Sequence, residues 1–209
     1  MATMFDNSFS EEFKKDYMTS AIDGFNFSVE NFGIEVKINS KATKVLLKNK
    51  VSGHEKEISA KLEEINVGDL VEIGTQKWLI VDLPVENEIY SKASLRRCNT
   101  TFVIKDKIQR VMTGRDDDDR PIFTEIAETI NEPCIATNTY STGNENEQLP
   151  LPDGNIDVIM RYRNADSLVI NKNFVLYNQT YEIYNIDYTK VIDGNGIMIV
   201  RGKREVSRK

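Results

Sequence analysis

Alternation of apolar and polar residues, the pattern of a half-buried strand, recurs along most of this chain. It begins near position 32, where Ile34, Val36 and Ile38 are separated by Glu35 and Lys37. Further runs of this kind, many of them bounded by Gly, Asn or Asp, occupy residues 57–62, 71–83, 156–161 and 174–186. The pattern predicts an all-β fold, mainly antiparallel and built of small barrel-like or sandwich-like modules.

Two of these runs share one pattern. Residues 71–83 and 174–186 each contain an apolar run, a polar turn and a second apolar run, with Trp78 aligned on Tyr181. Each run therefore predicts a β-hairpin. Two related β-modules would explain the match, and so would a chance similarity between two short hairpins.

The aligned aromatic residues Trp78 and Tyr181 have two interpretations. The favoured one is that each ring fills the core of a small β-module. The alternative is a platform on which the bases of a single-stranded nucleic acid stack, as in OB-folds. The net charge of −6 argues against the alternative, because affinity for nucleic acid depends on neutralising phosphates.

The N-terminal residues have helical spacing instead. Phe9, Phe13 and Tyr17 recur at every fourth position, which places the three rings on one face of a helix. Asp23-Gly24 is expected to end this helix. The favoured interpretation is that the aromatic face packs on the chain's own core, and the alternative is that it docks into a groove of a partner subunit.

The alternation fails between residues 105 and 131, which suggests short helical or irregular pieces around a charged loop at 114–121. We place the module boundary in that loop. The expected parts are an N-terminal helical arm, a first β-module, and a second β-module with a long polar loop at 138–148 and a basic tail: residues 1–30, 31–115 and 116–209.

Composition narrows the class of protein. Of the 209 residues, 40% are hydrophobic, which is enough for a real core, and the sequence pI is about 5.0. No apolar run approaches the length of a membrane span, so no membrane association is expected. The start of the chain does not have the pattern of a secretion signal, and we expect Cys98 and Cys134 to be free thiols in a reducing cytosol.

The sequence contains no recognisable catalytic set. His54, the single histidine, lies in a polar stretch, and the common nucleophile and phosphate-binding motifs are missing. The run Asp116 to Asp119 predicts a solvated loop, because consecutive aspartates point in different directions and do not converge on a cation. We therefore expect no enzyme, no cofactor and no metal site, although a pair of catalytic carboxylates needs no motif and stays open.

Two adjacent arginines are candidates for contact with a partner. Arg96 and Arg97 lie in a predicted strand and so face opposite sides of it. They could form ion pairs with a neighbouring subunit or with glutamates of the same chain. Together with the aromatic residues of the helix, they make up the candidate partner contacts: Phe9, Phe13, Tyr17, Arg96 and Arg97.

The order Gly68-Asp69, then Trp78 to Asp82, then Tyr90 to Asn99 resembles small β-rich structural proteins of tailed bacteriophages. The resemblance is to head-closure or head–tail connector proteins and extends over roughly residues 30 to 200. It implies a ring, hexameric or dodecameric, that assembles beneath the portal protein, closes the head, retains the packaged DNA and provides the surface to which the tail attaches. The apparent second β-module departs from many connector proteins, which are shorter.

The resemblance also implies partners and a location. The expected partners are other copies of the chain, the portal protein, a tail or tail-completion protein, and double-stranded DNA that passes through the lumen without sequence-specific binding. The protein would be found in the host cytoplasm before assembly and in the neck of the virion afterwards. The alternatives are a tail-completion or baseplate structural protein, or an OB-like single-stranded nucleic-acid-binding protein.

Overall fold

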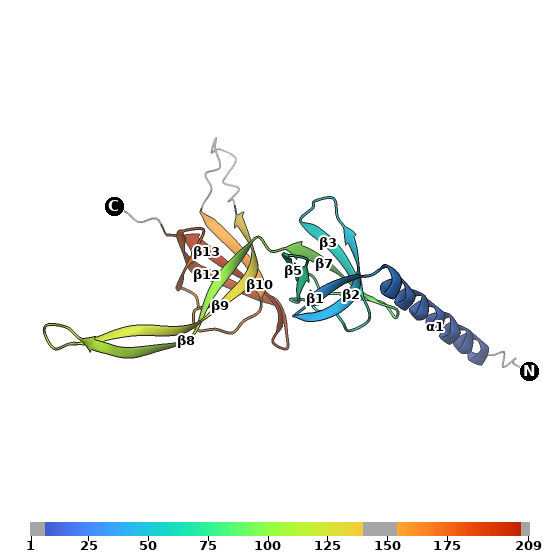
Figure 1. Ribbon diagram of the computed structural model, residues 1–209, viewed down its shortest axis with the longest axis horizontal. Helices are drawn as coiled ribbons and strands as arrows, with labels where there is room; N and C mark the ends of the chain where they lie inside the picture. Colours follow the sequence, from blue (N-terminus) through green and yellow to red (C-terminus); the bar gives the residue numbers. More distant parts are fainter. Residues whose placement is uncertain (1–6, 140–153, 206–209) are drawn as a thin grey trace, which may run out of the picture. The chain divides into compact units, whose positions relative to one another are not determined.

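The computed structural model describes residues 7–139 and 154–205, and the chain divides into two units, Met1–Arg97 and Cys98–Lys209 (Figure 1). The N-terminal unit contains one helix and seven strands: α1 (Asn7–Phe32), β1 (Ile34–Ile38), β2 (Lys41–Asn49), β3 (Glu55–Ala60), β4 (Leu70–Ile73), β5 (Gln76–Ile80), β6 (Val85–Glu86) and β7 (Ser91–Arg97). The C-terminal unit contains six strands: β8 (Thr100–Arg115), β9 (Pro121–Thr139), β10 (Asn155–Arg161), β11 (Asn173–Leu176), β12 (Gln179–Ile192) and β13 (Asn195–Arg204).

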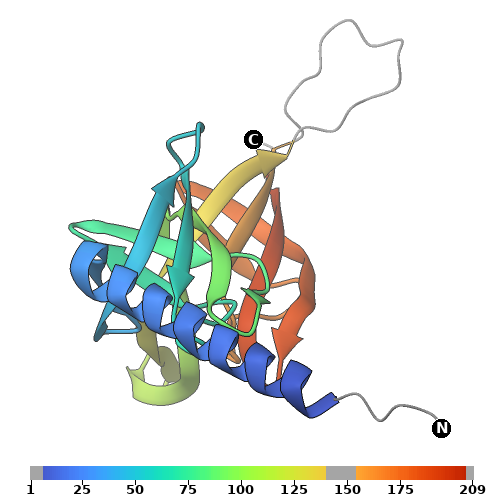
Figure 2. The same ribbon diagram turned by 90° about the vertical axis from the view of Figure 1, so that its right-hand side faces the viewer.

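Helix α1 is longer than the sequence pattern predicts. It continues through Asp23-Gly24 to Phe32, and Figure 2 shows it as one unbroken helix. A single glycine inside a helix costs only about 1 kcal/mol, which the following helical turns can offset. The helix ends at Phe32, and the N–H of the following Gly33 donates to the carbonyl of Val29 at 2.9 Å.

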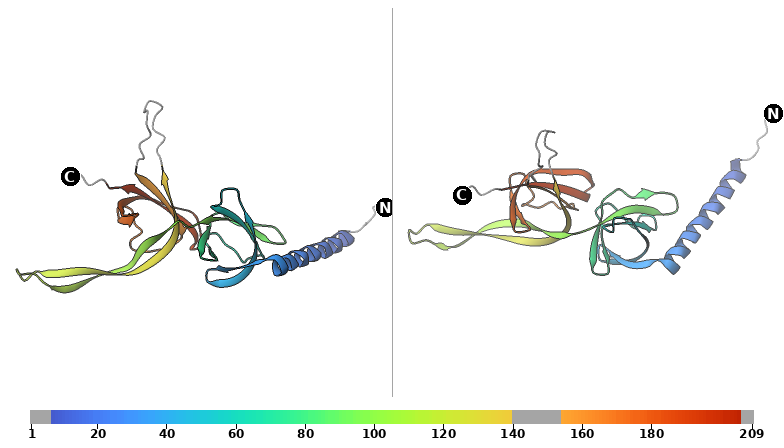
Figure 3. Two further views of the ribbon diagram at one scale, coloured as in Figure 1. Left: turned by 45° about the horizontal axis from the view of Figure 1, so that its top comes forward. Right: turned by 90° about the horizontal axis from the view of Figure 1, so that it is seen from above.

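The sheet of the N-terminal unit closes into a small barrel. Its strand order is β3-β2-β1-β4-β5-β7-β6, and β3 also pairs with β7, so that only β6 lies outside the closed ring (Figure 3). The alternating residues of β1 fit this arrangement, because Val36 and Ile38 are buried while Glu35 and Lys37 are exposed. The core is aliphatic around the fully buried indole of Trp78.

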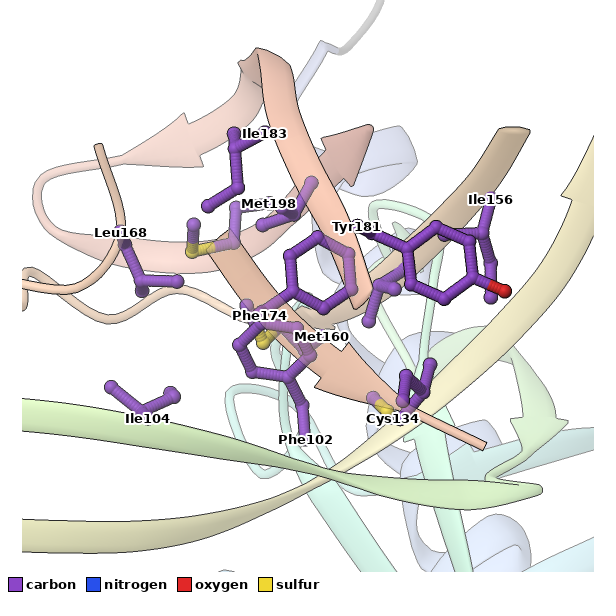
Figure 4. Close-up of a cluster of buried hydrophobic side chains, with 13 residues drawn as sticks. Phe102, Ile104, Cys134, Ile156, Met160, Leu168, Phe174, Tyr181, Ile183 and Met198 are labelled. Atoms are coloured by element: carbon purple, nitrogen blue, oxygen red, sulfur yellow. The ribbon is translucent and has the colours of Figure 1, made fainter. Parts of the chain in front are cut away.

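The C-terminal unit has an antiparallel sheet in the order β11-β12-β13-β10-β9-β8. Its core is richer in aromatic residues, and Figure 4 shows the rings of Phe102, Phe174 and Tyr181 together. The Phe102 and Phe174 rings are 5.0 Å apart between centroids, and the Phe174 and Tyr181 rings are 5.4 Å apart and stacked. Every strand pairing in both units is antiparallel, which confirms the predicted all-β class with an N-terminal helix.

The two runs that share a pattern both form hairpins with the same register. Val71 pairs with Trp78 in the β4–β5 hairpin, and Phe174 pairs with Tyr181 in the β11–β12 hairpin. Both aligned rings are buried, which confirms that they fill the cores of their units. A ring that is buried in a core cannot serve as a stacking platform, so the nucleic-acid interpretation of these two residues is wrong.

Apart from the turn at residues 116–120, the segment from 105 to 131 is strand, so the prediction of helical or irregular pieces on both sides of the charged loop is wrong. β8 and β9 pair across it, with register shifts between Asp106 and Gln109 and between Met112 and Gly114. Each bulge adds a residue and changes which face the following side chains occupy, so the period of two is lost although the backbone stays extended.

The predicted module boundary at 115/116 is wrong for the same reason. The charged loop is the tip of the β8–β9 hairpin, inside one sheet, and the units divide between Arg97 and Cys98. Residues 140–153, which include most of the predicted polar loop, and residues 206–209 of the basic tail lie outside the described part of the chain. No helix among the described residues has both the length and the apolar character that a bilayer crossing requires.

Candidate functional site

The most exposed part of the C-terminal unit is the β8–β9 hairpin from Lys107 to Thr129, which we call the ribbon. Figures 1 and 3 show it extending beyond the other strands of its sheet. No residue of the ribbon is buried, although both of its strands are paired along almost their whole length. The ribbon therefore lacks a core of its own.

The two faces of the ribbon differ in charge. Cross-strand partners lie on the same face, and successive pairs alternate between the faces. Between residues 109 and 126 one face, the uncharged face, carries aliphatic, threonine and glutamine side chains: Gln109, Val111, Thr113, Ile122, Thr124 and Ile126. The other, the mixed face, carries two apolar and two charged side chains: Arg110, Met112, Phe123 and Glu125. On the mixed face the Arg110 guanidinium lies 6.0 Å from the centre of the Phe123 ring. The ion pair of Lys107 with Glu128 lies nearer the base of the ribbon.

Large apolar side chains of both faces are in contact with solvent. Val111, Met112, Ile122, Phe123 and Ile126 are between 40% and 57% exposed. An isolated two-stranded hairpin is only marginally stable in water, and neighbouring exposed apolar side chains are typical of interaction surfaces. The ribbon is thus the clearest candidate in this unit for contact with another molecule.

The tip of the ribbon is acidic, and most of its carboxylates have local partners. Asp116 accepts hydrogen bonds from the N–H groups of Asp118 and Arg120 at 3.0 and 2.8 Å. Asp119 pairs with the Arg115 guanidinium at 2.9 Å. These contacts hold the turn, and the described residues contain no group of acidic, histidine or cysteine side chains that could hold a metal.

Two of the three aromatic residues in the predicted stripe of α1 do not pack on the described core. Phe13 and Tyr17 are 68% and 67% exposed, so the favoured interpretation of the helix is wrong for both. The side chain of Phe9 lies outside the described part of the chain. Contact with a partner subunit stays a prediction for these residues.

Helix α1 is held by its C-terminal turns. Val29 is buried, the Phe25 ring stacks on Tyr90 with 4.9 Å between centroids, and the Lys44 ammonium donates to the Glu30 carbonyl at 3.0 Å. The described side chains in the first half of the helix make no such contacts, because the C-terminal end of the helix is the part that reaches the barrel. Sequence periodicity identified the aromatic stripe but could not show that the barrel ends short of it.

Arg96 and Arg97 form the end of β7. Arg96 is half-buried and Arg97 is exposed, as expected for neighbours on opposite sides of a strand. The Arg97 N–H donates to the carbonyl of His54 at 3.0 Å. Within the described ranges neither guanidinium forms an ion pair with a glutamate, so a partner contact stays open for both.

A buried ion-pair network was missed by sequence reasoning. Glu132 of β9 is 1% exposed, and its two carboxylate oxygens accept hydrogen bonds from Nε of Arg161 at 3.0 Å and Nε of Arg163 at 3.1 Å. A buried charge is tolerated when it is paired and hydrogen-bonded, which is the case here. The network fixes β9 to the end of β10, next to the base of the ribbon, and nothing in the local pattern around Glu132 signals burial.

Three titratable side chains of the C-terminal unit have pKa values shifted by burial or by hydrogen bonds. Burial raises the pKa of the Cys134 thiol to about 12, so this cysteine is a poor nucleophile. A hydrogen bond from the Thr189 N–H lowers the pKa of Asp187, which also lies 3.5 Å from the Arg201 guanidinium. Burial raises the pKa of Asp157, on which Arg201 acts in the opposite direction.

Comparison with known proteins identifies the family. Residues 7–97 match the YomX N-terminal domain, and residues 97–203 match the YomX C-terminal domain. The chain belongs to the YomX family. The two family domains meet at residue 97, where the two structural units divide.

A relative from Bacillus subtilis (strain 168), the SPbeta prophage-derived uncharacterized protein YomX, is 27% identical over 181 residues, which covers 84% of each chain. These matches indicate a phage-derived protein. Among solved structures the chain is similar to MrkH, described as a c-di-GMP-dependent transcription regulatory factor, with a TM-score of 0.19 and 12% identity over 91% of this chain and 84% of that one. A TM-score this low is no basis for inferring a shared fold or function.

Proposed function

We propose that this protein is a structural component of the tailed-phage particle that forms a ring in the neck, beneath the portal. The observation that carries the proposal is the ribbon, whose two faces expose apolar side chains without any covering layer in the described chain. A protein that keeps such a surface uncovered as a free chain is suited to assembly with other subunits. The phage-derived family supports the same context.

The physical argument concerns the stability of the ribbon. A sheet of two strands has no second layer, so its side chains gain little from burial. Large aliphatic or aromatic side chains on it become favourable when another surface removes them from water, at roughly 25 cal/mol for each Å². Both the apolar content and the extended shape of the ribbon are thus explained if it is an intersubunit arm.

Helix α1 is the second element suited to assembly. Its exposed rings, Phe13 and Tyr17, lie one helical turn apart on a segment that is attached to the barrel only by its C-terminal turns. Two arms on one chain would let each copy contact two neighbours, as a ring requires. In the proposed neck, one arm faces other copies, and the portal and the tail protein contact the remaining surfaces.

The proposal assigns the protein no catalytic role and no cofactor. It places the protein in the host cytoplasm before assembly and in the virion neck afterwards, with packaged double-stranded DNA passing through the lumen. The net charge of −6 favours passage over retention, because a protein with excess negative charge has a weak overall attraction for phosphates. A tail-completion or baseplate protein would need the same kind of arms, and its location in the particle separates it from a neck protein.

Copy number in purified particles tests the proposal. The chain and the portal protein are quantified together by mass spectrometry with isotope-labelled peptides, and the portal provides the internal standard. A single neck ring predicts about six or twelve copies per particle. Absence from particles would refute a structural role, and several dozen copies would point to the tail or the baseplate.

A further inference from the structure

The sheet of the C-terminal unit, unlike that of the N-terminal barrel, is not closed by a strand pairing. β8 and β11 are its outermost strands, and no pairing joins them. The Ser167 N–H donates to the Lys105 carbonyl at 3.1 Å, and the Lys105 N–H donates to the Ser167 hydroxyl at 2.9 Å. Both backbone groups of Lys105 therefore point away from β9, and by alternation so do those of Val103.

A pocket of about 380 Å³ lies between these two edges. The buried rings of Phe102 and Phe174, which lie side by side in Figure 4, form its floor. The exposed side chains of Val103 and Val175 flank it. Lys105 lines the rim, and among the described residues its ammonium has no hydrogen bond or ion pair. The pocket is thus apolar below, with an unpaired positive charge at its margin.

The tip of the ribbon has the complementary properties. Met112 and Phe123 are cross-strand partners on the mixed face, and both are exposed apolar residues close to the tip. Asp117 is exposed as well, and within the described chain its carboxylate has no partner, unlike those of its three neighbours. An apolar pair close to a free carboxylate matches an apolar pocket with a free ammonium at its rim.

We propose that the ribbon of one copy docks in the β8–β11 pocket of a second copy. Phe123 and Met112, which share the mixed face, cover the floor and flanks of the pocket, and Asp117 approaches Lys105. This inference rests on the proposed function and deepens it, because it names the contact that joins neighbouring copies in the ring.

The position of the two surfaces on one chain determines the symmetry of the contact. Both lie on β8, and the ten residues of extended strand from Lys105 to Arg115 span about 33 Å. A ribbon therefore cannot reach the pocket of its own unit. Two different surfaces of each copy are used, so the contact is head-to-tail, and its repetition gives a closed ring or an open filament.

A mixing experiment with two variants tests the head-to-tail contact. Phe123→Asp disables the ribbon, and Val175→Arg blocks the pocket; both residues are more than half exposed, so the fold should tolerate the changes. By sedimentation velocity, the wild-type protein should form assemblies larger than a dimer, and each variant alone should be monomeric. An equal mixture should form one-to-one pairs and nothing larger, since only one intact ribbon and one intact pocket are available.

Two sedimentation results would contradict the head-to-tail contact. Wild-type protein that stays monomeric at its highest soluble concentration would overturn the proposal, and would leave the pocket to a different protein or to a small amphipathic anion. A mixture that stays monomeric would overturn it as well. Ile192→Asp is the matched control, because Ile192 is 54% exposed and lies outside both surfaces; its assembly should equal that of the wild type.

A charge exchange tests the pairing of Lys105 with Asp117. Lys105→Glu should weaken self-association by about two- to fivefold, as expected for an exposed ion pair, and the effect should shrink at high salt. Adding Asp117→Lys to the same chain should restore the association. A double variant that associates no more tightly than Lys105→Glu alone would overturn this pairing.

The inference and the proposed function can fail separately. Six or twelve copies per particle together with a monomeric mixture would mean that a ring exists but is held by other contacts. One-to-one pairs in the mixture together with absence from particles would mean that the contact is real and the neck assignment is wrong.

Discussion

Two phenylalanines of one hairpin offer a direct test of the uncovered ribbon. Phe102 and Phe123 lie in β8 and β9, the paired strands of that hairpin, but Phe102 is 2% exposed and Phe123 is 52% exposed. Replacing Phe102 with alanine removes a ring from a packed core, and the expected loss of unfolding free energy is about 3–5 kcal/mol. Replacing Phe123 with alanine removes a ring that is already half in water, so the expected loss is below about 1 kcal/mol.

The assay must report on the C-terminal unit alone. Trp78 is the only tryptophan and lies in the N-terminal unit, so its fluorescence reports the unfolding of that unit and not of the C-terminal one. Hydrogen exchange of the amides of β10, measured by mass spectrometry in increasing urea, reports on the C-terminal sheet. Free energies of opening are compared for the wild type and the two alanine variants, with protein kept dilute to prevent association.

Equal losses for the two alanine variants would refute the reasoning. Such a result would mean that the Phe123 ring is packed in the free chain, so that the ribbon is not an available surface. A large loss for Phe102→Ala with a small one for Phe123→Ala would leave the ribbon uncovered in the monomer and would support its role in assembly.

Three further predictions concern other parts of the molecule. Removal of residues 1–22 should leave the circular dichroism of the β-units unchanged and reduce assembly, and loss of soluble fold would show that the first half of α1 belongs to a core. In native protein at pH 8, a thiol reagent should modify Cys98 well before Cys134, whose pKa is raised to about 12 by burial; equal rates would contradict that burial. Gly196→Ala should destabilise the C-terminal unit by about 2–3 kcal/mol, because φ is +132° and a Cβ there would collide with a backbone oxygen of β12. Gly194→Ala is its control: it has positive φ without a collision, so a similar cost for both would contradict the steric argument.

The prediction of strands succeeded where the period of two was unbroken. Val36, Ile38, Trp78 and Tyr181 are buried as their alternation required, and both predicted hairpins exist with equivalent registers. The prediction of strands failed where a bulge changed which face the following side chains occupy, as between Asp106 and Gln109. A bulge interrupts the alternation of apolar and polar residues, and the sequence then looks like an irregular segment although the backbone is a strand.

The candidate contacts were predicted only in part. The aromatic stripe of α1 was found from its spacing, but whether Phe13 and Tyr17 are covered depends on where the barrel ends. The exposed ribbon was not predicted, because Phe123 and Ile126 are of residue types that are usually buried in a core, and their exposure shows only in the structure. Burial of Glu132 between two arginines was not visible either, since its partners come from residues 161 and 163, about thirty positions away.

The sequence by itself determined which segments are extended, where two hairpins turn, and that one helix precedes the strands. These properties depend on residues within a few positions of one another: side-chain period, turn chemistry and helical spacing. The tertiary structure alone decided that β3 closes on β7, that β8 and β11 do not pair with each other, and that the ribbon has no covering layer in the described chain. Alternation shows that one face of a strand is to be buried but does not show against what, and the answer depends on contacts between residues far apart in the chain.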